Sequence, residues 1–120
     1  MIYLIDDDKS VRGALERLMK SAQLPVKTYA SGQEFVDSVL PGETDCVIFD
    51  ASVPGVNGME LLRHFHEHNV DAQLILLTRD DDEETRAQAR RLGATGCFVK
   101  PVDGQALLDA IRFSLTSRGC

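Results

Sequence analysis

Cys46-Val47-Ile48-Phe49-Asp50 is the stretch that decides the fold, because four consecutive apolar residues end in an acid. A short run that is apolar at every position is typical of a strand buried on both faces of a parallel sheet. Further strand candidates occur at residues 2–5, 26–29, 74–77 and 97–99. Parallel neighbours need long crossover connections, usually helices. We therefore expect five strands that alternate with helices.

The segments between these strands carry apolar residues at helical spacing. Ser31 to Glu34 form a capping box that begins the second helix, Asn57 is placed to cap the third, and Gly93 is placed to end the fourth. The apolar positions expected to face inward include Val11, Leu15, Leu18 and Ala22, then Leu61, Leu62 and Phe65, then Leu107, Leu108, Ile111 and Leu115. This pattern predicts an α/β fold, a doubly wound (βα)5 parallel sheet with the flavodoxin-like strand order 2-1-3-4-5.

Length and charge limit the functions that this chain can have. Its 120 residues predict one domain over 1–115, with 116–120 as a frayed C-terminus or the start of a linker to a possible output domain. The formal net charge is −6, and the densest charge is the acidic run 80–84. Binding to a nucleic-acid backbone requires clustered Lys and Arg. We therefore expect no nucleic-acid contact by this domain.

Cysteines and hydropathy bear on the cellular compartment. Cys46, Cys97 and Cys120 show no metal-type pair, and their odd number forms no disulfide framework. They are expected to be ordinary thiols in a reducing compartment. The first apolar run ends at Asp6, which argues against a signal peptide. No apolar stretch reaches the ~20 residues of a membrane span. A soluble, cytoplasmic protein is the expectation.

Three histidines, His64, His66 and His68, invite a metal interpretation because His64 and His68 share one face of a helix. They have no Cys or Glu partner at zinc-site spacing. We interpret them as surface histidines.

Polar residues follow four of the five expected strands. Asp6 and Asp7 follow the first, Asp50 the third, Thr78 the fourth and Lys100 the fifth. Ligands of open α/β sheets bind outside the carboxyl ends of the strands, where the strand order reverses. We therefore expect three carboxylates, one hydroxyl and one ammonium to meet at one rim of the sheet.

The chemistry of that set is phosphoryl transfer. Crowded carboxylates repel one another unless a cation lies among them, and Mg²⁺ prefers oxygen ligands. A phosphoryl group delivered to Asp50 would give an acyl phosphate, which is hydrolysable. The metal and Lys100 would neutralise its equatorial oxygens, and Thr78 would donate a hydrogen bond.

These motifs occur in the order of a known family. With Ile5-Asp6-Asp7, Asp50 followed by Pro54 and Gly58, then Thr78, then Lys100-Pro101, the sequence resembles response-regulator receiver domains of the CheY-like superfamily across essentially its whole length. Residues 29–35, Tyr-Ala-Ser-Gly-Gln-Glu-Phe, further resemble the FixJ-like subfamily. That subfamily usually joins its receiver to a helix-turn-helix DNA-binding domain.

The resemblance implies a role for each motif residue. Asp50 would be the phosphoacceptor. Asp7, Asp50 and the backbone carbonyl of Ser52 would bind Mg²⁺, with Mn²⁺ as a substitute, and Asp6 would act largely through water. Thr78 and Lys100, the remaining catalytic residues, would contact the phosphoryl oxygens.

Other positions match modulators in the family or depart from it. Ser52 and Asp80 match positions that tune dephosphorylation. Arg79 stands where a small residue is usual, and Ala51 where a larger apolar one is usual. At the switch position the family typically has Tyr or Phe, but this sequence has Cys97, with Phe98 on the opposite face of the strand. The usual coupling of Thr movement to an aromatic flip is therefore in question.

The resemblance also implies partners. A sensor histidine kinase would supply the phosphoryl group from a phosphohistidine, and phosphorylation would switch the surface of the fourth helix, fifth strand and fifth helix, roughly residues 81–115. The output would be transcription through a C-terminal helix-turn-helix domain, with homodimerisation on phosphorylation. Such a domain phosphorylates and dephosphorylates itself and is not a turnover enzyme.

Three other functions compete with this one. A haloacid-dehalogenase-type phosphatase needs a second acid two residues after its Asp nucleophile, and Ser52 is there instead. A flavin-binding domain needs hydroxyls and amides after its first strand, where the acidic run 6–8 would repel phosphate. A degenerate receiver acting as a phosphorylation-independent interaction module stays open, because of Arg79 and Cys97.

Overall fold

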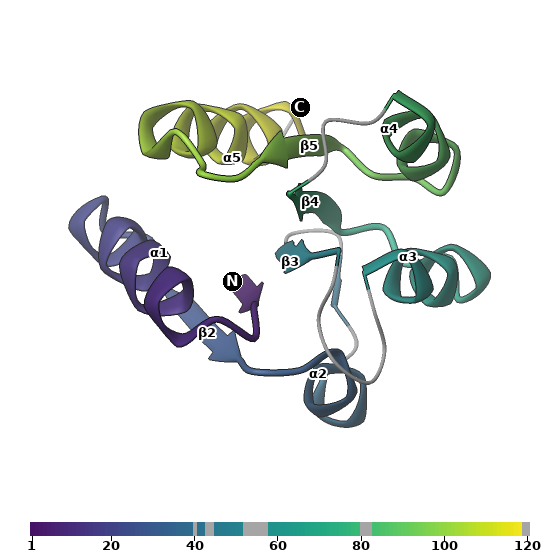
Figure 1. Ribbon diagram of the computed structural model, residues 1–120, viewed down its shortest axis with the longest axis horizontal. Helices are drawn as coiled ribbons and strands as arrows, with labels where there is room; N and C mark the ends of the chain where they lie inside the picture. Colours follow the sequence, from purple (N-terminus) through teal and green to yellow (C-terminus); the bar gives the residue numbers. More distant parts are fainter. Residues whose placement is uncertain (40, 43–44, 52–57, 80–82, 119–120) are drawn as a thin grey trace.

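Five parallel strands form one sheet at the centre of the protein (Figure 1). The computed structural model describes residues 1–39, 41–42, 45–51, 58–79 and 83–118. The strands are β1 (Ile2–Ile5), β2 (Val26–Tyr29), β3 (Cys46–Asp50), β4 (Gln73–Thr78) and β5 (Gly96–Val99). Their order is β2-β1-β3-β4-β5 and every pairing is parallel. The predicted fold class and strand order are confirmed.

Helices cover both faces of the sheet. They are α1 (Lys9–Ser21), α2 (Gly32–Ser38), α3 (Gly58–Glu67), α4 (Glu83–Arg91) and α5 (Gly104–Arg118). In Figure 1, α1 and α5 lie on one side of the sheet, and α2, α3 and α4 on the other. The alternation of strand side chains divides the core accordingly. Val47 and Phe49 pack with Phe35 and Phe65 on the α2–α4 face, whereas Ile48 packs on the α1–α5 face.

Local signals in the sequence set several helix ends. Asp8 caps α1, because its Oδ1 accepts hydrogen bonds from the backbone amides of Ser10 at 2.9 Å and Val11 at 3.2 Å. Ser31 caps α2 by accepting one from the amide of Glu34 at 3.2 Å. Each cap satisfies an amide that the first turn leaves without a helical partner.

Two further expectations about helix ends have clear outcomes. Glu34 reaches back as predicted, but its carboxylate accepts from the amide of Ala30 at 3.3 Å, one residue before the capping Ser. Gly93 follows α4 with a φ of 96°, the left-handed conformation that favours glycine at a helix end. Asn57 lies outside the described residues, so its predicted cap stays a prediction.

At the C-terminus, α5 continues to Arg118, and the predicted domain boundary at residue 115 stays a prediction. Cys120 lies outside the described residues. Within the described part of the chain, no helix combines the length and the apolar character needed to cross a membrane.

Candidate functional site

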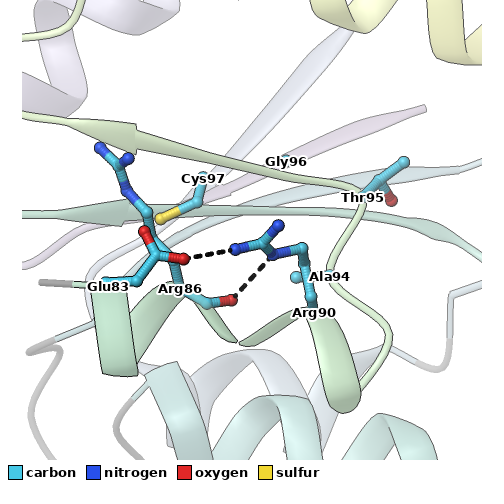
Figure 2. A pocket seen from close by; sticks show the side chains of 7 residues that line it. All are labelled: Glu83, Arg86, Arg90, Ala94, Thr95, Gly96 and Cys97. Atoms are coloured by element: carbon cyan, nitrogen blue, oxygen red, sulfur yellow. Dashed lines mark hydrogen bonds and ion pairs between the residues drawn. The ribbon is translucent and has the colours of Figure 1, made fainter. Parts of the chain in front are cut away.

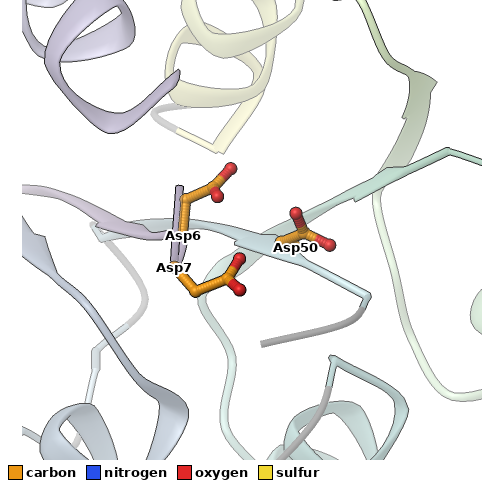
Figure 3. A group of neighbouring side chains, drawn as sticks. All are labelled: Asp6, Asp7 and Asp50. Atoms are coloured by element: carbon orange, nitrogen blue, oxygen red, sulfur yellow. The ribbon is translucent and has the colours of Figure 1, made fainter. Parts of the chain in front are cut away.

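Three carboxylates meet at the carboxyl end of the sheet. One oxygen each from Asp6, Asp7 and Asp50 lies within 4.8 Å of the others (Figure 3). The three sequence-predicted acids therefore come together, although β1 and β3 are far apart in the chain. Asp6 and Asp50 are buried, with 0% and 1% exposure, whereas Asp7 is exposed. The cluster has an open side at Asp7.

The sheet register and the β1–α1 turn position these acids. Ile5 pairs with Phe49, so the residues that follow them, Asp6 and Asp50, lie side by side. Asp6 Oδ1 accepts a hydrogen bond from the amide of Asp8 at 2.9 Å. Arg12, from the first turns of α1, donates from Nη1 to the Asp6 carbonyl at 2.7 Å. The turn that carries two of the acids is thus held by its own backbone and by α1.

A close backbone approach positions Asp50. A Cβ on Gly58, the first residue of α3, would lie 2.6 Å from Ala51 Cα and 2.8 Å from the Asp50 carbonyl oxygen. Contacts below 3.0 Å with backbone force the chain to move. Glycine at position 58 therefore lets α3 begin against the end of β3.

Lys100 is the cation of the site. Its Nζ donates to Asp6 Oδ2 at 2.8 Å and also to Asp50 Oδ2. Burial alone would lower the pKa of Lys100, but the hydrogen bonds to Asp50 and Asp6 outweigh burial and raise that pKa above its usual value. One ammonium does not balance three carboxylates, so the cluster keeps an excess of negative charge.

This donor set suits a hard divalent cation. It offers carboxylate oxygens from two buried acids and one exposed acid. Carboxylate oxygens are ligands that Mg²⁺ prefers. The acidic cluster could hold a metal ion in that way. Ser52, whose carbonyl was the expected third protein ligand, lies outside the described residues, as do Pro54 and Asp80.

Thr78 and Lys100 reach the same rim from neighbouring strands. Thr78 is buried at the end of β4, and its carbonyl accepts from the Lys100 amide at 2.8 Å. Arg79, the next residue, is exposed. Ala51 continues β3 and its amide donates to the Leu77 carbonyl at 2.8 Å. The sequence-predicted catalytic set, Asp50, Thr78 and Lys100, is therefore brought to one edge of the sheet.

Cys97 and Phe98 lie on opposite faces of β5, as expected. Cys97 packs against the core of the α2–α4 face, and Phe98 against the core of the α1–α5 face. Cys97 is partly buried and lines a pocket between α4 and β5. The sequence did not predict this pocket, because it forms where α4 meets the residues in and just before β5 (Figure 2), and no local pattern describes that contact.

The histidines and Cys46 lie away from the acids. His66 and His68 are exposed and His64 is half-buried, and His68 Nδ1 lies 2.8 Å from the His64 carbonyl oxygen. Within the described residues they join no group of three metal ligands. Cys46 is completely buried in β3, as its apolar neighbours indicated.

Sequence reasoning missed Arg12 and the backbone approach at Gly58. Arg12 lies on α1, and a lone Arg on a helix has no pattern that links it to the preceding turn. Gly58 was recognised only as part of a family motif. Its steric role follows from the contact between α3 and β3, which no local pattern describes.

Comparisons with known proteins agree with this geometry. The family described as "Response regulator receiver domain" matches residues 2–112. The transcriptional regulatory protein FixJ of Azorhizobium caulinodans is 33% identical over 114 residues, which are 95% of this chain and 54% of FixJ. The C4-dicarboxylate transport transcriptional regulatory protein DctD of Pseudomonas aeruginosa is 37% identical over 117 residues, which are 98% of this chain and 25% of DctD.

Solved structures show the same architecture. Full-length FixJ from B. japonicum superposes with a TM-score of 0.87 at 29% identity, covering 98% of this chain and 58% of that chain. The chain thus spans about half the length, or less, of the relatives that it matches.

Proposed function

The chain belongs to the response regulator receiver domain family, and on that premise we propose that Asp50 accepts a phosphoryl group in a Mg²⁺-dependent reaction. The observation that supports this most directly is the cluster of Asp6, Asp7 and Asp50 with Lys100 in contact with two of them. The proposed nucleophile, the proposed metal ligands and the cation proposed to neutralise phosphate charge therefore come from residues that lie close together at one end of the sheet.

In the proposed reaction the Asp50 carboxylate attacks the phosphorus of a phosphohistidine. The P–O bond forms while the P–N bond breaks, and the imidazole takes the bonding electron pair. Mg²⁺ bound by Asp7, Asp50 and the Ser52 carbonyl, with Asp6 acting through water, would balance charge on the acids and the phosphoryl oxygens. Lys100 would turn to a phosphoryl oxygen, and Thr78 would donate a hydrogen bond to another. Water later hydrolyses the acyl phosphate, with Ser52 and Asp80 tuning the rate, and Arg79 modulates the access of the donor.

Intact-mass spectrometry tests this proposal. With acetyl phosphate and Mg²⁺, wild type should gain the mass of one phosphoryl group, and Asp50→Asn should gain none. Asp37→Asn is the matched control, because Asp37 is an exposed acid on α2 and its variant should be labelled like wild type. Labelling of Asp50→Asn at the wild-type level would refute the site assignment.

The wider role rests on the relatives. FixJ and DctD are named as transcriptional regulators, so we propose that this receiver controls transcription through a further domain with a helix-turn-helix. We further propose that a sensor histidine kinase donates the phosphoryl group and that the protein forms a homodimer when it is phosphorylated. Cys97 would occupy the switch position, and the protein would be cytoplasmic. The domain would phosphorylate and dephosphorylate itself and would not be a turnover enzyme.

A contact-only receiver is the second candidate, favoured by Arg79 at the mouth of the site and by Cys97. It predicts that wild type stays unmodified with acetyl phosphate and also with its cognate kinase. The same mass measurement therefore separates the two functions.

A further inference from the structure

Arg12 lies near the start of α1 and reaches back to the turn that joins β1 to this helix. Its Nη1 donates a hydrogen bond to the Asp6 carbonyl oxygen at 2.7 Å. A hydrogen bond from a charged donor is shorter and stronger than one between neutral groups. Arg12 is half-buried, so water competes only partly for this contact. The side chain therefore ties α1 firmly to the end of β1.

The carbonyl that Arg12 holds belongs to the peptide group between Asp6 and Asp7. A peptide group is planar, so fixing its carbonyl also fixes the direction in which the chain enters Asp7. The rest of Asp6 is held by other elements, because its amide donates to the Tyr29 carbonyl at 3.1 Å and its carboxylate accepts from Lys100 at 2.8 Å. Those two contacts anchor Asp6 itself, whereas the hydrogen bond from Arg12 anchors the peptide group that follows it.

Asp7 is the acid whose direction depends most on this peptide group. It is exposed, whereas Asp6 and Asp50 are buried, so packing holds its side chain less than theirs. One oxygen of its carboxylate nevertheless lies within 4.8 Å of an oxygen of each of the other two acids (Figure 3). The orientation of the backbone that carries Asp7 therefore decides whether its carboxylate faces the cluster.

We propose that Arg12 is a positioning residue for Mg²⁺, which holds the peptide group between Asp6 and Asp7 and so directs the Asp7 carboxylate into the metal site. This inference rests on the proposed function, in which Asp7 is a direct ligand of the ion. Mg²⁺ demands nearly ideal octahedral geometry, so the placement of each ligand matters. Residues that orient metal ligands typically change metal affinity about 10–100-fold when they are replaced.

The charge of Arg12 acts in the opposite direction to its hydrogen bond. A cation beside the acidic cluster repels Mg²⁺, so removal of the charge alone would strengthen the binding of the ion. Loss of the hydrogen bond would weaken that binding, because the turn could then carry Asp7 away from the site. The two effects therefore predict changes of opposite sign when a neutral residue replaces Arg12.

The test is a titration of ¹⁵N-labelled protein with Mg²⁺, followed by NMR, which gives the dissociation constant from the amide resonances of residues 6–8. Arg12→Gln should raise this constant about tenfold or more. Arg17→Gln is the matched control, because it removes an exposed guanidinium from the same helix and should leave the constant unchanged. Dispersion of the same spectra shows that each variant is folded during the measurement.

The rate of phosphorylation by acetyl phosphate gives a second measurement. In Arg12→Gln, the Mg²⁺ concentration that gives half of the maximal rate should rise by the same factor as the dissociation constant. The maximal rate at saturating Mg²⁺ should stay close to that of wild type, because Asp50, Thr78 and Lys100 are unchanged. A general distortion of the site would lower the maximal rate instead, and that result would contradict a positioning role.

Failure of this inference can be told apart from failure of the proposed function. If wild type binds Mg²⁺ and folded Arg12→Gln binds it equally or more tightly, the positioning role of Arg12 is refuted and the proposed reaction at Asp50 is untouched. If wild type itself binds no Mg²⁺, the proposed function and this inference are both refuted.

Discussion

At the residue scale, Lys100 is the internal counter-ion of the acidic cluster. It contacts Asp6 and Asp50, which are 94 and 50 residues away in the chain, and both are almost fully buried. A buried charge that loses its partner is costly, because water does not replace the partner. The ion pairs therefore stabilise the folded state. They also hold Asp6 and Asp50 in place, the acids that are proposed to act on the metal ion and the phosphoryl group.

Lys100→Met should lower the free energy of unfolding by about 3 kcal/mol at neutral pH, because it leaves two buried carboxylates without their cation. Urea denaturation measures this loss. Lys20→Met, which removes an exposed Lys paired with Glu16 at 3.7 Å, should cost at most about 0.5 kcal/mol. Equal effects of the two variants would contradict this role of Lys100.

The pH dependence of this contribution has a definite sign. The pKa of Lys100 is raised in the folded protein from an ordinary value of 10.5. A basic group whose pKa is raised by folding contributes its full stabilisation at pH values below its pKa in the unfolded chain. That contribution is lost as the pH rises through its pKa in the folded protein. The stability difference between wild type and Lys100→Met should thus be constant near neutral pH and shrink only above about pH 10.5. A decrease already between pH 7 and pH 8 would contradict the raised pKa.

Cys46 should be unreactive in the native protein. Burial is the main cause that raises the pKa of its thiol to about 12, and the thiolate is the reactive form. At pH 8, iodoacetamide should modify the partly buried Cys97 and leave Cys46 intact, and in urea both should react. Peptide mapping by mass spectrometry separates the sites. Native modification of Cys46 at the rate of Cys97 would show that β3 is accessible.

At the element scale, the start of α3 against the end of β3 decides where Asp50 lies. Glycine at position 58 makes this possible, because a Cβ there would overlap with the backbone of Ala51 and Asp50. Gly13 offers the opposite case, because a Cβ there would meet only the flexible Arg17 Nη1 at 3.5 Å. Two glycines at or within helices should therefore respond to the same substitution with opposite signs.

Gly58→Ala should destabilise the protein by about 2 kcal/mol or more, since the backbone of Ala51 and Asp50 must move. Gly13→Ala should stabilise it by about 0.5–1 kcal/mol, the helix preference for Ala over Gly. Thermal and urea unfolding measure both changes. A neutral Gly58→Ala would mean that α3 shifts without cost.

At the scale of the whole molecule, the sheet holds two separate cores and carries the acidic cluster at its end. The side chains of the α1–α5 face and the α2–α4 face pack on opposite sides of β1, β3 and β4. In the folded state Asp6, Asp7 and Asp50 are held so close together that their carboxylates repel one another. A cation that binds there should therefore stabilise the entire fold by linkage.

Addition of Mg²⁺ should raise the Tm in a concentration-dependent way, because the ion binds the native cluster and not the unfolded chain. Asp7→Asn should lose most of this shift, since it removes the exposed acid of the cluster, whereas Asp37→Asn should keep it. Differential scanning calorimetry checks both. An equal rise in Tm for Asp7→Asn and wild type would exclude Asp7 as a ligand.

The fold and the approximate site were predictable from the sequence because their signals are local. Apolar runs such as 46–49 mark buried strands wherever they occur, and the crossover rules leave few ways to arrange five of them. Polar residues directly after those runs must then meet at one rim. Ser31 likewise revealed the start of a helix, since a cap contacts only the next turn.

Tertiary structure alone decided what depends on contacts between distant elements. The sequence Asp6-Asp7 does not tell which acid is buried, and the fold buries Asp6 beside Lys100 and leaves Asp7 exposed. Neither the hydrogen bond from Arg12 to the β1–α1 turn nor the pocket between α4 and β5 has a local pattern. Periodicity reports which face of an element is apolar, whereas distances across elements arise only when the faces pack together.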